Sequence, residues 1–165
     1  MSARIGGFAT ALGVIAADQI SKWAIMGPIA LPARGPIELL PIFRLIWVEN
    51  RGVSMGFLVA GSNAERWVLA GVTAAIAIGV LIWLLRERSR IDALALGAIL
   101  GGAIGNIADR VRLGYVADFL NLHFGAWSPF LVFNVADAAI SVGVVLLAVR
   151  ALIVRDASPS EKANV

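Results

Sequence analysis

Two aspartates in apolar surroundings are the residues of this chain best suited to acid–base chemistry. Asp118 stands in the sequence Val-Ala-Asp-Phe and Asp137 in Val-Ala-Asp-Ala, and neither has a basic residue beside it. An ionisable group at the edge of hydrocarbon costs about 2.5 to 3.5 kcal/mol on insertion scales, so it requires a partner or a purpose. Two carboxylates held close together in a low-dielectric site share one proton, which provides a base and an acid at neutral pH.

The spacing alone also allows a structural interpretation of these two residues. A carboxylate in the first turn of a helix is stabilised by the helix dipole, and Asp137 opens the last apolar segment of the chain. Asp118 is equally consistent with a turn. The tripeptide Val-Ala-Asp recurs nineteen residues apart, which is weak evidence in an alanine-rich chain. Both interpretations therefore stay open at this point.

Two further aspartates have basic neighbours, which favours structural ion pairs. Asp18 and Lys22 are four residues apart, so on a helix they share a face and can pair. Asp109 is followed at once by Arg110, and we expect a carboxylate–guanidinium pair at a helix end.

The composition excludes several other kinds of catalytic site. The chain has no cysteine and a single histidine, His123, so thiol nucleophiles, thiolate metal sites and zinc sites with two or three histidines are ruled out. Residues 52–56 match the G-x-S-x-G motif of serine hydrolases around Ser54. That motif requires a strand-to-helix turn and a histidine base, neither of which is evident here. We expect no metal and no cofactor.

The balance of hydrophobic and charged residues is that of a membrane protein. Of the 165 residues, 59% are hydrophobic and only 15% are charged, against roughly 25% charged in soluble domains. Residues 67–85 contain no charge, and nineteen residues at about 1.5 Å each span a hydrocarbon core of about 30 Å. The net charge of +3 comes from scattered residues, not from a basic patch, so nucleic acid is not an expected partner.

We predict an all-α membrane protein with four transmembrane helices and a small extracytoplasmic β-rich segment between helices 1 and 2. Residues 1–154 form a single integral membrane domain, and the polar residues 155–165 form a cytoplasmic tail. The predicted spans are residues 5–25, 67–85, 93–108 and 135–154, which leaves 27–66 and 109–134 as extracytoplasmic segments.

The loops between the spans set the orientation and the outer structure. Seven Lys and Arg lie within the 27 residues 1–4, 86–92 and 150–165, on the side of the termini. Six lie within the 66 residues 27–66 and 109–134, on the other side. The positive-inside rule therefore predicts cytoplasmic termini. Four prolines in residues 28–41 predict an irregular segment without helix. Residues 42–48 read as a strand or an amphipathic surface segment.

Five short polar motifs, in order along the chain, resemble those of lipoprotein signal peptidase, the signal peptidase II family of bacterial inner-membrane aspartic proteases. The motifs are Asp18-Gln19-Ile20-Ser21-Lys22-Trp23, Asn50-Arg51-Gly52, Gly105-Asn106-Ile107-Ala108-Asp109-Arg110, Gly114-Tyr115-Val116-Ala117-Asp118-Phe119 and Phe133-Asn134-Val135-Ala136-Asp137. Each motif is short, but together they fall at the ends of the four predicted spans. Met55 stands where the family usually has Phe.

The resemblance implies Asp118 and Asp137 as the catalytic pair. It places Asn50, Gly52, Asn106, Arg110 and Asn134 around the site and gives Asp18 and Lys22 a structural role.

The resemblance also implies a reaction and a location. The substrates would be diacylglyceryl-modified prolipoproteins, cut just before the lipidated cysteine, at a site toward the outer face of the bacterial cytoplasmic membrane. The lipid bilayer and peptide inhibitors of the globomycin type are the other partners implied.

A small proton-coupled membrane transporter is the alternative from another functional class. In such a protein Asp18, Asp118 and Asp137 would relay protons across the bilayer. Transporters of this kind usually have repeated halves and charges near the midplane, whereas the acidic residues here gather near one face.

Overall fold

The computed structural model describes residues 2–52, 63–125 and 127–156, which form five helices and three strands. The residues of the G-x-S-x-G motif after Gly52, and with them Ser54 and Met55, lie outside the described residues. The elements are α1 (Ala3–Met26), α2 (Leu31–Arg34), β1 (Ile37–Leu40), β2 (Phe43–Asn50), α3 (Asn63–Arg86), α4 (Arg90–Arg112), β3 (Val116–Leu122) and α5 (Val135–Asp156).

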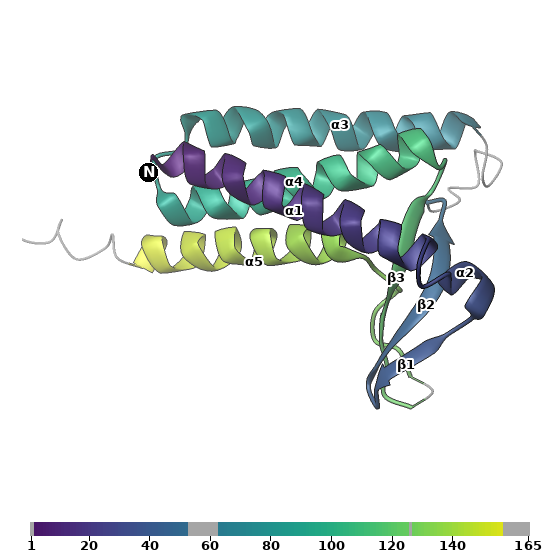
Figure 1. The fold of residues 1–165 in the computed structure, drawn as a ribbon. Helices are drawn as coiled ribbons and strands as arrows, with labels where there is room; N and C mark the ends of the chain where they lie inside the picture. The colour runs from purple at the N-terminus through teal and green to yellow at the C-terminus, as the bar shows by residue number, and fades with distance from the viewer. Residues whose placement is uncertain (1, 53–62, 126, 157–165) are drawn as a thin grey trace, which may run out of the picture.

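The four long helices lie side by side, and a small sheet projects from one end of the bundle (Figure 1). Helix α4 is central and packs against α1, α3 and α5. In the described chain three helical stretches are long and apolar enough to cross a membrane, Arg66–Arg86, Arg90–Arg112 and Val135–Ile153. The N-terminus and the end of α5 lie at the end of the bundle away from the sheet (Figure 1).

Glycines on α4 allow its neighbours to approach closely. A Cβ atom at Gly101 would lie 2.5 Å from the carbonyl oxygen of Ala11 on α1, and one at Gly102 would lie 2.5 Å from that of Ala136 on α5. Small residues at helix contacts are typical of membrane bundles, where close packing replaces the hydrophobic effect as the source of association. This packing brings the polar ends of α1, α4 and α5 together.

An ion pair joins α4 and α5 at the end of the bundle away from the sheet. The Arg150 Nε atom lies 2.6 Å from an Asp92 carboxylate oxygen, and both side chains are partly buried. The pair links the first turn of α4 to the last third of α5.

The sheet has the strand order β1-β2-β3 with both pairs antiparallel. Its first two strands lie where the sequence predicts a β-rich segment, between the first two long helices. The third strand comes from the segment after α4, and the sequence analysis missed it. Most of β3 is buried, so its side chains do not show the alternation of polar and apolar residues that marks a half-buried strand.

Two details of the outer segments differ from the sequence prediction. Prolines did not exclude helix from residues 28–41, because Leu31–Arg34 form one helical turn. Pro32 stands in its first turn, where the missing N–H is not needed for a helical hydrogen bond. Helix α4 continues to Arg112, so Asp109 and Arg110 lie in its last turn.

Candidate active site

Asp118 is the third residue of β3 and is almost completely buried, with 1% of its surface exposed. Both of its carboxylate oxygens accept hydrogen bonds from asparagine side chains. The Asn50 Nδ2 atom donates to Oδ2 at 2.9 Å, and the Asn134 Nδ2 atom donates to Oδ1 at 2.7 Å. Asn50 is the last residue of β2, next to β3, so strand pairing sets this contact.

Asp137 lies in the first turn of α5 and is half-buried. Its backbone N–H donates to Asn134 Oδ1 at 2.9 Å, while the Asn134 N–H donates back to Asp137 Oδ2 at 3.3 Å. This reciprocal pair is a capping box, so the helix-capping interpretation of Asp137 is correct. The other oxygen, Oδ1, accepts from Asn106 Nδ2 of α4 at 2.8 Å.

Asn134 therefore connects the two aspartates directly. Its side chain is fully buried and contacts Asp118 through Nδ2 and Asp137 through Oδ1. Asn134 Nδ2 also donates to Asn106 Oδ1 at 3.1 Å, which ties the bridge to α4. The resemblance implies both asparagines around the site. In the structure Asn134 contacts both aspartates, and Asn106 contacts Asp137 and Asn134.

The environment of Asp118 favours its protonated form. Burial raises the pKa of Asp118 to about 6, and the negative charge of Asp137 acts in the same direction. The amide groups of Asn50 and Asn134 oppose this rise, because they donate to the ionised form. A carboxyl group with this pKa can hold a proton close to neutral pH while a neighbouring carboxylate is ionised.

Gly52 holds Asn50 in position. Its backbone N–H donates to Asn50 Oδ1 at 3.0 Å, which leaves Asn50 Nδ2 directed at Asp118. The φ angle of Gly52 is +97°, a conformation that favours glycine. The Asn-x-Gly motif thus fixes one donor of the site through local backbone geometry.

A buried ion cluster lies beside the two aspartates. Lys22 Nζ is 2.8 Å from an Asp18 oxygen and 2.7 Å from an Asp109 oxygen. The pairing of Asp18 with Lys22 follows the prediction, but that of Asp109 with Arg110 was wrong. Consecutive residues on a helix point in different directions, and α1 supplies the cation for Asp109 instead.

Two further residues of the third motif, Gly105 and Arg110, lie close to these acidic side chains. Gly105 lies where a Cβ atom would be 2.6 Å from Asp18 Oδ2, so only glycine lets Asp18 reach α4. Arg110 is half-buried, and the charges of Asp137, Asp118 and Asp109 act on its guanidinium. Arg110 lies in the last turn of α4, within the electrostatic influence of both aspartates.

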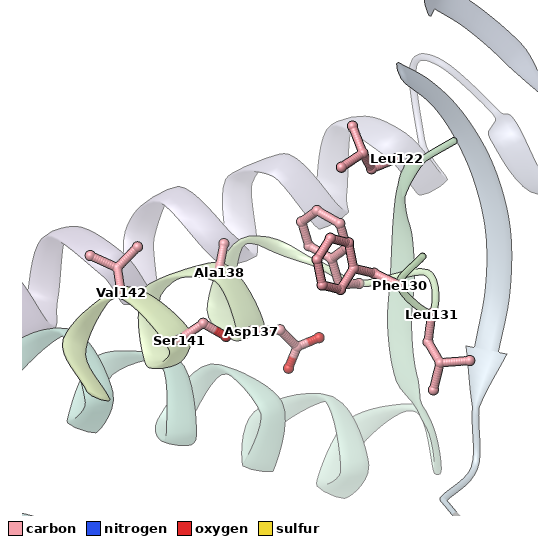
Figure 2. Close-up of a pocket in the computed structure, with 8 residues that line it drawn as sticks. Leu122, Phe130, Leu131, Asp137, Ala138, Ser141 and Val142 are labelled. Carbon is pink, nitrogen blue, oxygen red and sulfur yellow. The ribbon is translucent and has the colours of Figure 1, made fainter. Parts of the chain in front are cut away.

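A cavity of about 360 Å³ opens beside Asp137 (Figure 2). Ala138, Ser141 and Val142 line it from α5, with Leu122, Phe130 and Leu131 across from them. Apart from Asp137 and the Ser141 hydroxyl, this lining is apolar. The carboxylate thus lies in a hollow suited to a largely apolar molecule.

The single histidine has a structural partner in the sheet. His123 Nε2 lies 3.1 Å from Glu38 Oε2. The contact joins the residue that follows β3 to strand β1. Within residues 2–52, 63–125 and 127–156, no three His, Cys, Asp or Glu side chains are grouped as metal ligands.

Comparison with known proteins identifies the family of the chain. The family model described as "Signal peptidase (SPase) II" matches residues 10–153. The chain belongs to the signal peptidase II family. A lipoprotein signal peptidase of Rhizorhabdus wittichii is 64% identical over 150 residues, which cover 91% of this chain and 87% of that protein. A lipoprotein signal peptidase of Sphingopyxis alaskensis is 47% identical over 149 residues, which cover 87% of this chain and 86% of that protein.

Solved structures share the fold. A chain described as "Bacterial membrane enzyme structure by the in meso method at 2.3 A resolution" superposes with a TM-score of 0.75 at 24% identity, over 96% of this chain and 93% of that one. The resemblance found in the five sequence motifs is thereby confirmed. Membership of the signal peptidase II family implies a protease, and this disfavours the transporter alternative.

Several residues next to the site escaped the sequence analysis of this signal peptidase II chain. Gln19 was quoted within a motif but given no role, yet its Nε2 atom donates to Asp18 Oδ2 and to Asp109 Oδ1, both at 3.1 Å. Ser141 and Phe130 line the cavity. The position of Ser141 one helical turn after Asp137 was the available signal, because residues four apart share a helix face.

The raised pKa of Asp118 predicts that stability falls as the pH rises. An aspartate in an unfolded chain has a pKa of about 3.9, whereas burial raises that of Asp118 to about 6 in the fold. Folding therefore favours the protonated form, and this contribution, full below about pH 4, is lost as the pH rises through about 6.

The Asp118→Asn variant, which stays neutral, is expected to gain in Tm over the unaltered protein between pH 4 and pH 7. Thermal melting of both proteins in detergent measures this difference. A Tm difference that stays constant across that range would contradict the raised pKa.

Proposed function

We propose that this chain is an aspartic endopeptidase in which Asp118 and Asp137 activate water for hydrolysis of a peptide bond. The observation that carries the proposal is the bridge by Asn134. Its Nδ2 atom donates to the Asp118 carboxylate at 2.7 Å, and its Oδ1 atom accepts from the backbone N–H of Asp137 at 2.9 Å. The negative charge of Asp137 raises the pKa of Asp118, so the two groups interact and one proton is favoured on the pair.

The proton balance assigns a role to each carboxyl group. Asp118 holds the proton and Asp137 is the base that removes a proton from water. As the water oxygen bonds to the scissile carbonyl carbon, Asp118 donates its proton to the carbonyl oxygen, which forms a neutral tetrahedral diol. The C–N bond then breaks as Asp137 returns its proton to the leaving nitrogen, and one hydroxyl proton of the diol returns to Asp118.

The polar residues around the pair orient it. Asn50 and Asn134 hold the two oxygens of Asp118, and Asn106 holds Oδ1 of Asp137. These fixed donors keep both carboxyl groups in one orientation as protons move, which is the preorganisation that catalysis requires. The charges of both aspartates act on the Arg110 guanidinium, and we assign Arg110 to polar groups of the substrate backbone.

We propose prolipoproteins as the substrates, cut just before a diacylglyceryl-modified cysteine. The relatives are named lipoprotein signal peptidases. The cavity beside Asp137 supports this choice, because its apolar lining suits the lipid or the apolar signal segment of such a substrate. We expect peptide inhibitors of the globomycin type to occupy the same cavity.

We further propose that α1 is a fourth membrane span. Its two charged residues near the outer end, Asp18 and Lys22, are 0% and 1% exposed, so they do not face lipid. Its exposed residues include large apolar side chains, among them Ile5, Leu12 and Trp23. A helix that turns its charges inward and its apolar side chains outward is suited to a bilayer.

The arrangement of the helices supports one orientation. With four spans, residues 1–154 are a single integral membrane domain, and both termini and the 86–92 turn share one side. The density of Lys and Arg favours the cytoplasm for that side of the bacterial inner membrane, with residues 155–165 as a cytoplasmic tail. The sheet and the aspartate pair then lie toward the outer face.

The catalytic assignment is tested with Asp118→Asn and Asp137→Asn, each purified separately. Each is expected to lower kcat by about 10²- to 10⁴-fold, the usual contribution of a general acid or base. Cleavage of a lipidated precursor by the purified proteins measures this. Asp92→Asn is the matched control, because it makes the same change at the other end of α4 and should retain activity. Turnover near that of the unaltered protein by either site variant would refute the pair.

The substrate assignment is tested by filling the cavity. Ser141→Phe places a large side chain in the cavity one turn from Asp137, and we expect KM for the lipidated precursor to rise at least tenfold. Val145→Phe is the control, since Val145 is exposed on the next turn and does not line the cavity. Equal KM values for the two variants would mean that the substrate binds elsewhere.

A further inference from the structure

We propose that the buried cluster of Asp18, Lys22 and Asp109 is a clamp that fixes the distance between Asp118 and Asp137. This inference rests on the proposed function, in which those two aspartates are the catalytic pair. Asp18, Lys22 and Asp109 are then positioning residues, because they act on the site through the backbone.

Each carboxylate of the cluster holds the residue that immediately precedes a catalytic aspartate. Asp109 Oδ2 accepts a hydrogen bond from the backbone N–H of Ala117 at 3.1 Å. Asp18 Oδ1 accepts one from the backbone N–H of Ala136 at 3.0 Å. The same contact is thus made twice, once at β3 and once at the start of α5.

Lys22 joins the two arms of the clamp. Its Nζ atom lies 2.8 Å from Asp18 and 2.7 Å from Asp109, and Gln19 Nε2 donates to both carboxylates as well. Together with the contacts to Ala117 and Ala136, these donors reach all four oxygens of the two carboxylates. A continuous path of ion pairs and hydrogen bonds therefore runs from the backbone beside one catalytic aspartate to the backbone beside the other.

This geometry gives the repeated tripeptide Val-Ala-Asp a physical reason. Ala117 and Ala136 are both 0% exposed, so a larger side chain has no room at either position. Each alanine presents its N–H to the cluster, and the next residue presents its carboxylate to the site. The two copies resemble each other because both dock on the same cluster.

Stability is a poor explanation for such a cluster. A buried ion pair can often be replaced by apolar residues of similar volume without loss of stability, because desolvation offsets the attraction between the charges. The three buried ionisable groups of this cluster incur such a desolvation cost. What apolar side chains cannot supply is a directional contact to two backbone N–H groups on separate elements.

Asp109→Asn tests the clamp. It removes one charge and replaces one acceptor oxygen by an amide donor, so the hold on Ala117 is weakened. A misplacement of about 1 Å can cost about 10²-fold in rate, and we expect kcat per folded enzyme to fall at least tenfold. KM for the lipidated precursor is expected to stay within twofold, because Asp109 does not line the cavity beside Asp137.

Asp92→Asn is the matched control for a structural effect. It breaks the ion pair with Arg150, which joins two partly buried side chains of different helices at the opposite end of α4. Loss of Tm with unchanged kcat is expected for this variant. If Asp109→Asn behaves in the same way, with kcat equal to that of the unaltered protein, the clamp is refuted.

A second variant covers the case in which Asp109→Asn does not fold. Gln19→Met removes the hydrogen bonds to both carboxylates but leaves Lys22 between them, and it is expected to lower kcat at constant KM. An unchanged kcat in a folded Gln19→Met protein would then overturn the clamp. The same assay includes Asp118→Asn. An active Asp118→Asn refutes the catalytic pair itself, whereas an inactive one beside a fully active Asp109→Asn refutes the clamp alone.

Discussion

The ammonium group of Lys22 lies between two carboxylates that are almost completely shielded from solvent. Without a cation at this position, Asp18 and Asp109 would be buried like charges in an apolar bundle, a situation that costs several kcal/mol per ion. With it, Asp18 joins α1 to the start of α5 and Asp109 joins α4 to β3. The polar end of the bundle is organised around this one charge.

The close approach of the helices makes that arrangement possible. Glycines at positions 101, 102 and 105 let α1 and α5 come within reach of α4, and at Gly105 the missing side chain leaves the space that the Asp18 carboxylate fills. Charged groups then meet one another and not lipid. The same close packing of α1, α4 and α5 leaves apolar side chains along the bundle and gathers the charged groups at one end.

The sequence identified candidate residues of this site better than it predicted the contacts between them. Asp118 and Asp137 could be singled out because their neighbours are apolar, and the pair of Asp18 and Lys22 follows from helical spacing. The partner of Asp109 could not be found that way, since Lys22 is 87 residues away in the chain and Arg110 is adjacent. Local spacing predicts contacts within one helix and is silent about contacts between helices.

Other features were missed for related physical reasons. Strand β3 is buried along most of its length, so no alternation of polar and apolar residues marks it. The cavity beside Asp137 is assembled from α5, β3 and the loop that joins them, and its lining has no common sequence pattern. The two interpretations of Asp137 also proved compatible, because one residue caps α5 and faces Asp118 through Asn134.

The pH dependence of kcat/KM tests most directly the claim that the two aspartates share one proton. This ratio reports the ionisation of the free enzyme, in which the pKa of Asp118 is raised to about 6 by burial. The account predicts a bell-shaped profile whose alkaline limb falls as the pH rises through about 6, because the pair then loses the shared proton. A value of kcat/KM that stays constant from about pH 5 to pH 9 would contradict it.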